Sequence, residues 1–226
     1  MPTPATIAIL PFAFADWKTD RTGAEFCRGM ASLVEGRLRL IPDSQVFVQH
    51  LIYSPDKDSE QRTFFMRGEM WPVDEALELP APENAPPTHL VQGSMAFTED
   101  SVELTVEVIE APAGIVCFRE AIKRTPEEFL AGFFPFLAEI AKSIRAPLPR
   151  EVVSLIRRRS TSSYSAFRSY LIGLSRRLER ELAPNNARTP MPFRPFQNAV
   201  SEDPRFLEPC VAIDMLAREC FRERHD

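Results

Sequence analysis

The stretch Ser101-Val102-Glu103-Leu104-Thr105-Val106-Glu107-Val108 alternates polar and apolar residues at every step. Strict alternation is typical of a strand with one face on a hydrophobic core and the other in water. Turn signals flank this stretch at residues 98–101 and 111–114, and apolar segments lie beyond them at 89–98 and 115–122. We therefore predict three antiparallel strands joined by short turns.

A different pattern precedes these strands. Residues 6–12 form a short apolar run that ends in proline, and residues 44–53 are rich in β-branched and aromatic residues. Between them, residues 22–40 carry one apolar helical face, made of Phe26, Met30, Leu33, Val34 and Leu38. A strand, a helix and a strand in this order predict a crossover that joins two parallel strands.

A second helix follows the antiparallel strands. Thr125 is a suitable N-cap, Pro126 suits the first helical position, and Glu128 completes a capping box. The apolar stripe of this helix is Phe129, Phe133, Leu137, Ile140 and Ile144, and Pro135 should kink or split it.

The proline-rich segment 54–87 predicts an irregular connector, with a short helix between about residues 64 and 71. A proline-rich ligand for a partner groove is the alternative for this segment. Together these elements predict an α+β fold, a mixed sheet with helices packed on it.

The rest of the chain is helical in pattern. Residues 152–181 predict a helix that breaks near 161–163, where Ser163 caps the second part. Residues 183–195 predict a loop, residues 196–200 a helical piece, and residues 206–222 a last helix with Leu207, Val211, Met215 and the 216–217 region facing inward. We place the boundary between two domains at the prolines near residue 147, with a sheet domain at 1–147 and an all-α segment at 148–226.

Charge divides the chain at the same place. Residues 1–147 carry 13 Lys and Arg against 22 Asp and Glu, whereas residues 148–226 carry 14 against 10. Opposite net charges favour attraction between the two parts. We therefore predict that the basic helices between Arg157 and Arg180 pack near the acidic first part or near an acidic face of a partner.

Four short motifs carry a family resemblance. They are Leu10-Pro11-Phe12, a helix with Gly29-Met30, the strand Val91-Gln92-Gly93-Ser94-Met95, and Ile109-Glu110-Ala111-Pro112-Ala113-Gly114. In this order and spacing, residues 6–145 resemble the amino-terminal domain of TolB-like proteins. Glu110 stands where that family usually has Asp, and segment 54–87 departs from its compact helix. The resemblance implies binding of proteins, not turnover.

The helical segment resembles a tetratricopeptide (TPR) repeat. Phe196, Ala199 and Pro204 have the offsets of the second helix of that repeat, and Phe167-x-x-Tyr170-Leu171-x-Gly173 is similar to its first helix. The resemblance covers one atypical repeat and the first helix of another. Because fewer than three repeats bury too little surface, it implies packing on the first domain, on a second copy or on a partner.

Residue patterns for catalysis or metal binding are absent from the sequence. It contains no GxxxxGK and no GxSxG motif, and its three histidines and scattered cysteines give no zinc spacing. We expect no metal, no cofactor and no catalytic residue. His50 and His89 could meet across the sheet, but satisfied or surface histidines are the better explanation. We expect the four cysteines to be buried thiols: Cys27, Cys117, Cys210 and Cys220. Because the sequence shows no signal peptide and no membrane span, we expect a cytoplasmic location.

These observations predict a non-enzymatic protein–protein interaction or scaffold module that assembles with itself or with partner proteins. The alternatives are a nucleic-acid-binding protein that uses the basic helical segment and a small-ligand-binding sensor or accessory domain. Nucleic-acid binding is the first alternative, although no aromatic residues interleave with the basic clusters and no recognition helix is found. The candidate interaction residues are Arg157, Arg158, Arg159, Phe167, Tyr170 and Phe196.

Overall fold

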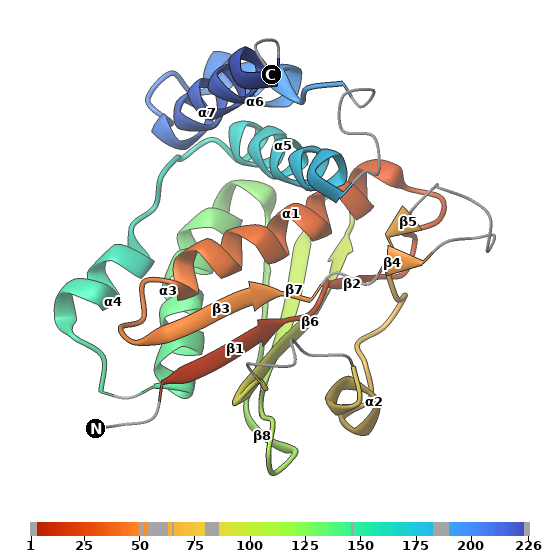
Figure 1. Ribbon diagram of the computed structural model, residues 1–226, viewed down its shortest axis with the longest axis vertical. Helices are drawn as coiled ribbons and strands as arrows, with labels where there is room; N and C mark the ends of the chain where they lie inside the picture. The colour runs from red at the N-terminus through yellow and green to blue at the C-terminus, as the bar shows by residue number, and fades with distance from the viewer. Residues whose placement is uncertain are drawn as a thin grey trace.

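The computed structural model describes residues 4–49, 52–53, 63–64, 66–79, 86–145, 147–182 and 190–223. One mixed sheet lies at the base of the molecule, and helices are stacked on it in successive layers (Figure 1). This arrangement confirms the predicted α+β class.

The main sheet has the strand order β3-β1-β6-β7-β8. Along this order lie β1 (Ala5–Ile9), β3 (Ser44–Val48), β6 (His89–Phe97), β7 (Val102–Glu110) and β8 (Ile115–Arg124), and a sixth, two-residue strand pairs with β6 beside them. β1 pairs in parallel with β3 and with β6, and β6, β7 and β8 are antiparallel. The predicted crossover and the predicted three-stranded unit are both confirmed.

Alternation along the strands divides the core between two faces of the sheet. Ile7 and Ile9 pack in the main core with α1 (Arg21–Leu38) and α3 (Pro126–Ile144). Ala8 and Leu10 point the other way, into a smaller cluster that includes Ala76 of α2 (Val73–Leu77). The two longer helices therefore cover one face, and α2 covers part of the other.

Capping side chains mark the amino-terminal ends of α1 and α3. The Asp20 carboxylate accepts a hydrogen bond from the Gly23 backbone N–H at 3.0 Å, and the Thr125 hydroxyl accepts one from Glu128 N–H at 3.4 Å. The predicted cap of α3 is thereby confirmed. Pro135 does not split α3, which continues to Ile144.

The carboxyl-terminal helices are α4 (Arg150–Arg157), α5 (Tyr164–Leu182), α6 (Phe193–Glu202) and α7 (Leu207–Glu223). The predicted break is confirmed, and the Ser163 hydroxyl accepts from Ala166 N–H at 3.1 Å as its cap. In Figure 1, α5 lies along α1, and α6 and α7 lie beyond α5. Ile156, Phe167 and Leu171 belong to the main core together with the residues of the sheet.

The orientation predicted for α7 is wrong for Leu207, Val211 and Met215, which are exposed by 64%, 58% and 42%. Within the predicted 216–217 region, Leu216 is buried, as are Pro209 and Ala212, whereas Ala217 is exposed. The helix carries apolar residues on two faces, and the face with Ala212 and Leu216 packs on Phe196 of α6.

Three further details differ from the sequence prediction. The strand expected at 44–53 ends at Val48, and Ile52–Tyr53 (β4) pairs with Thr63–Phe64 (β5) in a separate sheet. Phe64 is therefore in a strand and does not open a helix. β2 (Ala13–Phe14) was not predicted and pairs with β6. Residues 54–62, 65 and 80–85, and residues 183–189 of the loop predicted at 183–195, lie outside the described residues. The end of that predicted loop is helical, because α6 already begins at Phe193.

Candidate functional site

α1 and α5 lie very close together at Gly29. A Cβ atom at Gly29 would overlap the backbone carbonyl of Leu171, so only glycine permits this approach. Beside it, the ring of Phe167 lies 6.3 Å from that of Phe26 and 6.0 Å from that of Phe133. Phe167, a candidate interaction residue, is thus buried within its own chain.

Ion pairs surround this contact. The carboxylate of Glu25 is 1% exposed and accepts from the guanidinium of Arg176 at 3.0 and 3.1 Å and from Arg21 at 3.0 Å. Arg28 Nη2 donates to Glu179 at 2.5 Å. Burial lowers the pKa of Arg28, and the carboxylate of Glu179 opposes that shift. Both parts of the chain therefore contribute cations to the junction.

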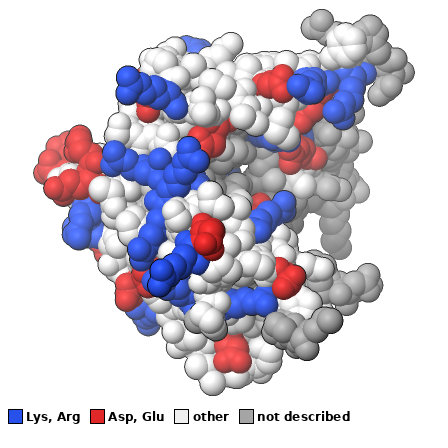
Figure 2. All heavy atoms as spheres, turned by 90° about the vertical axis from the view of Figure 1, so that its left-hand side faces the viewer, with Lys and Arg blue, Asp and Glu red and all other residues white. Residues whose placement is uncertain are grey.

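The basic cluster at the end of α4 lies at a second point of contact. Arg157 donates to the carboxylate of Glu139 in α3 at 2.9 Å, while Arg158 and Arg159 are exposed. Hydrogen bonds from Lys142 and Arg157 hold the pKa of Glu139 below its usual value. Figure 2 shows basic side chains gathered on the side of the molecule that includes α4, with acidic ones beside them. The predicted packing of basic helices on the acidic part is confirmed at Arg157 and at the junction described above.

Arg37 of α1 contacts three positions that follow α3 in the chain. Its guanidinium donates to Ser160 Oγ at 2.7 Å and to the Leu155 carbonyl at 3.2 Å, and it lies 3.6 Å from the Glu208 carboxylate. The same group stacks over the ring of Phe134, 5.2 Å from its centre. The start of α7 therefore lies beside α1.

Tyr170 and Phe196 lie where α5 meets α6 and α7. Their ring centres are 5.9 Å apart, and the Tyr170 ring is 5.1 Å from that of Phe206. Gly173 allows the Phe196 ring to lie against α5, since a Cβ there would be only 2.5 Å from that ring. Burial raises the pKa of Tyr170 to about 12. These two candidate residues also pack within the chain.

We call Leu207, Val211, Asp214, Met215 and Arg218 the outer face of α7. The three apolar members are among the most exposed large hydrophobic side chains of the described residues. Asp214 and Arg218 form an ion pair at 2.9 Å, with side chains that are 60% and 70% exposed. A row of exposed apolar side chains with flanking charges is typical of a protein interaction surface.

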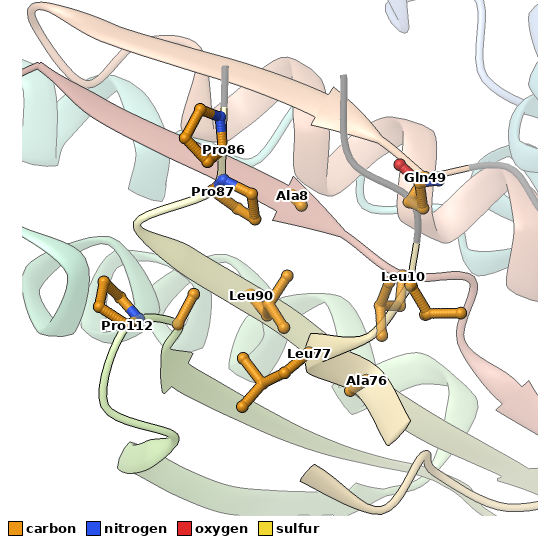
Figure 3. A pocket seen from close by; sticks show the side chains of 11 residues that line it. Ala8, Leu10, Gln49, Ala76, Leu77, Pro86, Pro87, Leu90 and Pro112 are labelled. Carbon is orange, nitrogen blue, oxygen red and sulfur yellow. The ribbon is translucent and has the colours of Figure 1, made fainter. Parts of the chain in front are cut away.

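An apolar pocket of about 420 Å³ lies on the α2 side of the sheet (Figure 3). Leu10, which directly follows β1, and Leu90 of β6 reach it from the sheet, and Leu77 reaches it from α2. Gln49 is the one polar side chain among its described lining residues. Ligand sites usually combine apolar walls with several polar groups that orient the ligand. This pocket has apolar walls but only one described polar side chain that could orient a ligand.

Among the described residues, no group of three or more His, Cys, Asp or Glu side chains could hold a metal ion. Cys27 is buried, but Cys117 and Cys210 are exposed and Cys220 is half-buried, so the prediction of four buried thiols is wrong for those three. Burial lowers the pKa of His89, and His50 lies outside the described residues. In the part of the chain that is described, no helix has the length and apolarity to cross a membrane.

Sequence reasoning missed the outer face of α7. The signal was present as apolar doublets at 206–207, 211–212 and 215–216. Adjacent helical residues are about 100° apart, so repeated doublets place apolar residues on two faces, and only one can face the core. The burial of Glu25 left no comparable signal, because it depends on how α5 lies across α1.

Comparison with protein-family profiles and with curated proteins gives no match. Among solved structures, a weak neighbour is the crystal structure of TolB from Acinetobacter baumannii, with 14% sequence identity and a TM-score of 0.41. The match covers 66% of this chain and 30% of that TolB chain. The chain therefore spans less than a third of the length of this neighbour. A likeness this weak carries no argument about function, and the tetratricopeptide resemblance stays a prediction.

Proposed function

We propose that the protein is a non-enzymatic interaction module in which a TolB-like sheet domain supports tetratricopeptide-like helices, and that the outer face of α7 contacts a partner protein. The observation that carries this proposal is the exposure of Leu207, Val211 and Met215 on a helix whose other face is packed. Exposed apolar side chains in a continuous row lose unfavourable contact with water when a partner covers them.

The packing of α6 supports the tetratricopeptide part of the proposal. Phe196 and Ala199 are both fully buried, and Pro204 lies between α6 and α7. Small and aromatic residues in these places allow consecutive helices to pack closely, as a helical repeat requires. In a stack of this kind, the face of a helix that points away from its neighbours is available for a further contact.

Site-specific photo-crosslinking tests this function. A benzoylphenylalanine placed at Val211 should give a discrete crosslinked product in the cell of origin, and Met215→Glu in the same chain should abolish it. The matched control carries the same probe at Leu155 of α4, which is 46% exposed. Absence of any product at Val211, or the same products from Leu155, would show that α7 is not an interaction surface.

A further inference from the structure

We propose that a cleft between α1 and α5 binds a small monocarboxylate with an apolar body, such as an arylalkanoate, and that Arg37 holds the carboxylate. The cleft is separate from the pocket beside α2 and from the outer face of α7, so this inference goes beyond the proposed function. Three observations carry it: the apolar lining of the cleft, the hydrogen-bond donors around Arg37, and the balance of charge there.

The cleft offers apolar surface of a size that suits a small ligand. Its volume is about 290 Å³, close to the lower limit of the roughly 300–1,000 Å³ typical of small-molecule sites. The rings of Phe134, Phe167 and Phe206 line it and are buried. Leu33 and Leu174 line it from α1 and α5 and are only half-buried, so apolar surface remains for a ligand to cover. One ring with a short aliphatic chain matches this size and lining.

Hydrogen-bond donors meet around Arg37, which also lines the cleft. Its guanidinium donates to Ser160 Oγ and to the Leu155 carbonyl, and it has more N–H donors than these contacts use. Burial raises the pKa of Tyr170 to about 12, Glu208 adds to this rise and Arg37 opposes it, so the hydroxyl stays protonated and lies near both charges. A carboxylate only accepts hydrogen bonds, so it suits a set of donors of this kind.

The charges beside the cleft favour a ligand with a single negative charge. Glu208 is 3.6 Å from Arg37, farther than the roughly 2.7–2.9 Å of a charge-assisted hydrogen bond, and its side chain is 40% exposed. Burial lowers the pKa of Arg37, Glu208 opposes this shift, and the nearby Arg158 adds to it. The two bases therefore exceed the acid by one positive charge. A phosphate monoester, with roughly two negative charges, would be repelled more strongly by Glu208.

The guanidinium of Arg37 is in position before any ligand binds. It stacks over the Phe134 ring at 5.2 Å from the ring centre, and its side chain is only 15% exposed. A group that is already ordered loses little conformational entropy on binding. A planar guanidinium also matches the two oxygens of a carboxylate.

Nuclear magnetic resonance titration of the full chain tests this chemistry with three probes of one shape. Phenylpropionate, phenylpropanol and phenylpropylamine share the ring and the chain and differ in charge. At equal ionic strength, the acid should bind with saturation and about tenfold or more tightly than the alcohol, because only the acid pairs with a partly buried guanidinium. The amine should bind more weakly than the alcohol. Acetate should bind more weakly than phenylpropionate, because it leaves the apolar surface uncovered.

An arginine substitution tests the role of Arg37. Arg37→Gln should reduce the affinity for phenylpropionate to about that for phenylpropanol, and the affinity for the alcohol should change little. The matched control is Arg39→Gln on the same helix. The Arg39 side chain pairs with Glu35, is 62% exposed and is not among the described residues that line the cleft, so this variant should keep the preference for the acid.

A second substitution fills the cleft and leaves the charges in place. Gly36 lines the cleft, and a Cβ there has no atom within 4 Å, so Gly36→Leu should fold and weaken binding of both the acid and the alcohol at least several-fold. Gly132→Leu in α3 is its control, because a Cβ at Gly132 makes only one ordinary contact, with Arg124, and lies outside the cleft. This control should bind both probes like the wild type.

Several results would overturn the proposal. They are the absence of saturable binding of phenylpropionate, equal affinity for the acid and the alcohol or the amine, and equal affinity for acetate. A preference for the acid that survives Arg37→Gln, or binding unaffected by Gly36→Leu, would place the ligand elsewhere. If Arg37→Gln does not fold, Gly36→Leu decides the location. None of these results bears on the crosslink from Val211, which tests the proposed function alone.

Discussion

At the level of single residues, Gly29 determines how closely α5 lies on α1. A methyl group there would meet the backbone of Leu171, which cannot rotate away as a side chain can. Gly29→Ala should therefore lower the free energy of unfolding by about 1–3 kcal/mol, as for other overpacked sites. Urea denaturation followed by circular dichroism measures this loss.

Gly36 is the matched control because it lies on the same helix. A Cβ at Gly36 has no atom within 4 Å, so Gly36→Ala should leave packing unchanged and stabilise the protein by about 0.4–1 kcal/mol through the unfolded state. Equal effects of the two substitutions would show that helix propensity, and not contact with Leu171, determines the result.

Between elements, the Glu25–Arg176 ion pair connects α1 to α5. The carboxylate is 1% exposed and the guanidinium is 44% exposed, so water screens only one partner well. A double-mutant cycle with Glu25→Ala and Arg176→Ala should give a coupling energy of about 1 kcal/mol or more. The free energies of unfolding of the four proteins provide the measurement.

The Glu103–Lys123 pair on the open sheet surface is the comparison. Its atoms are 3.3 Å apart, but its side chains are 42% and 65% exposed. Exposed pairs contribute about 0.2–1 kcal/mol and weaken with salt. A coupling for Glu25 and Arg176 no larger than this, and equally reduced by salt, would mean that the charges do not hold α5 on α1.

Most elements of the sheet domain were predictable because their signals are local. The alternation around Val106, the cap at Thr125 and the stripe of α3 need no knowledge of the rest of the fold. The face of α7 that turns inward was not predictable, because both of its apolar faces suit burial and the position of α6 decides between them. The sequence proposed Phe167 and Phe196 as interaction residues, and only their neighbours in space show that they pack within the chain.

Across the whole molecule, the hydrophobic core crosses the boundary predicted near residue 147. Leu171 of α5 is fully buried in one cluster with residues of β1, α1 and α3. If unfolding is cooperative, the loss of packing at one point of a continuous core lowers the free energy of unfolding of the whole chain. The two sequence segments should therefore unfold together.

Leu171→Ala tests this cooperation through probes in different parts of the chain. Both tryptophans, Trp17 and Trp71, lie in the first 147 residues, whereas the substitution is in α5. Loss of the buried side chain should cost about 2–5 kcal/mol and lower the urea midpoint. Tryptophan fluorescence and circular dichroism should report the same shift, while Leu155→Ala, at an exposed site, should leave both curves nearly in place. If the fluorescence midpoint stayed at its wild-type value while the helical signal was lost early, the helices would be a separate folding unit and the core would not act as one.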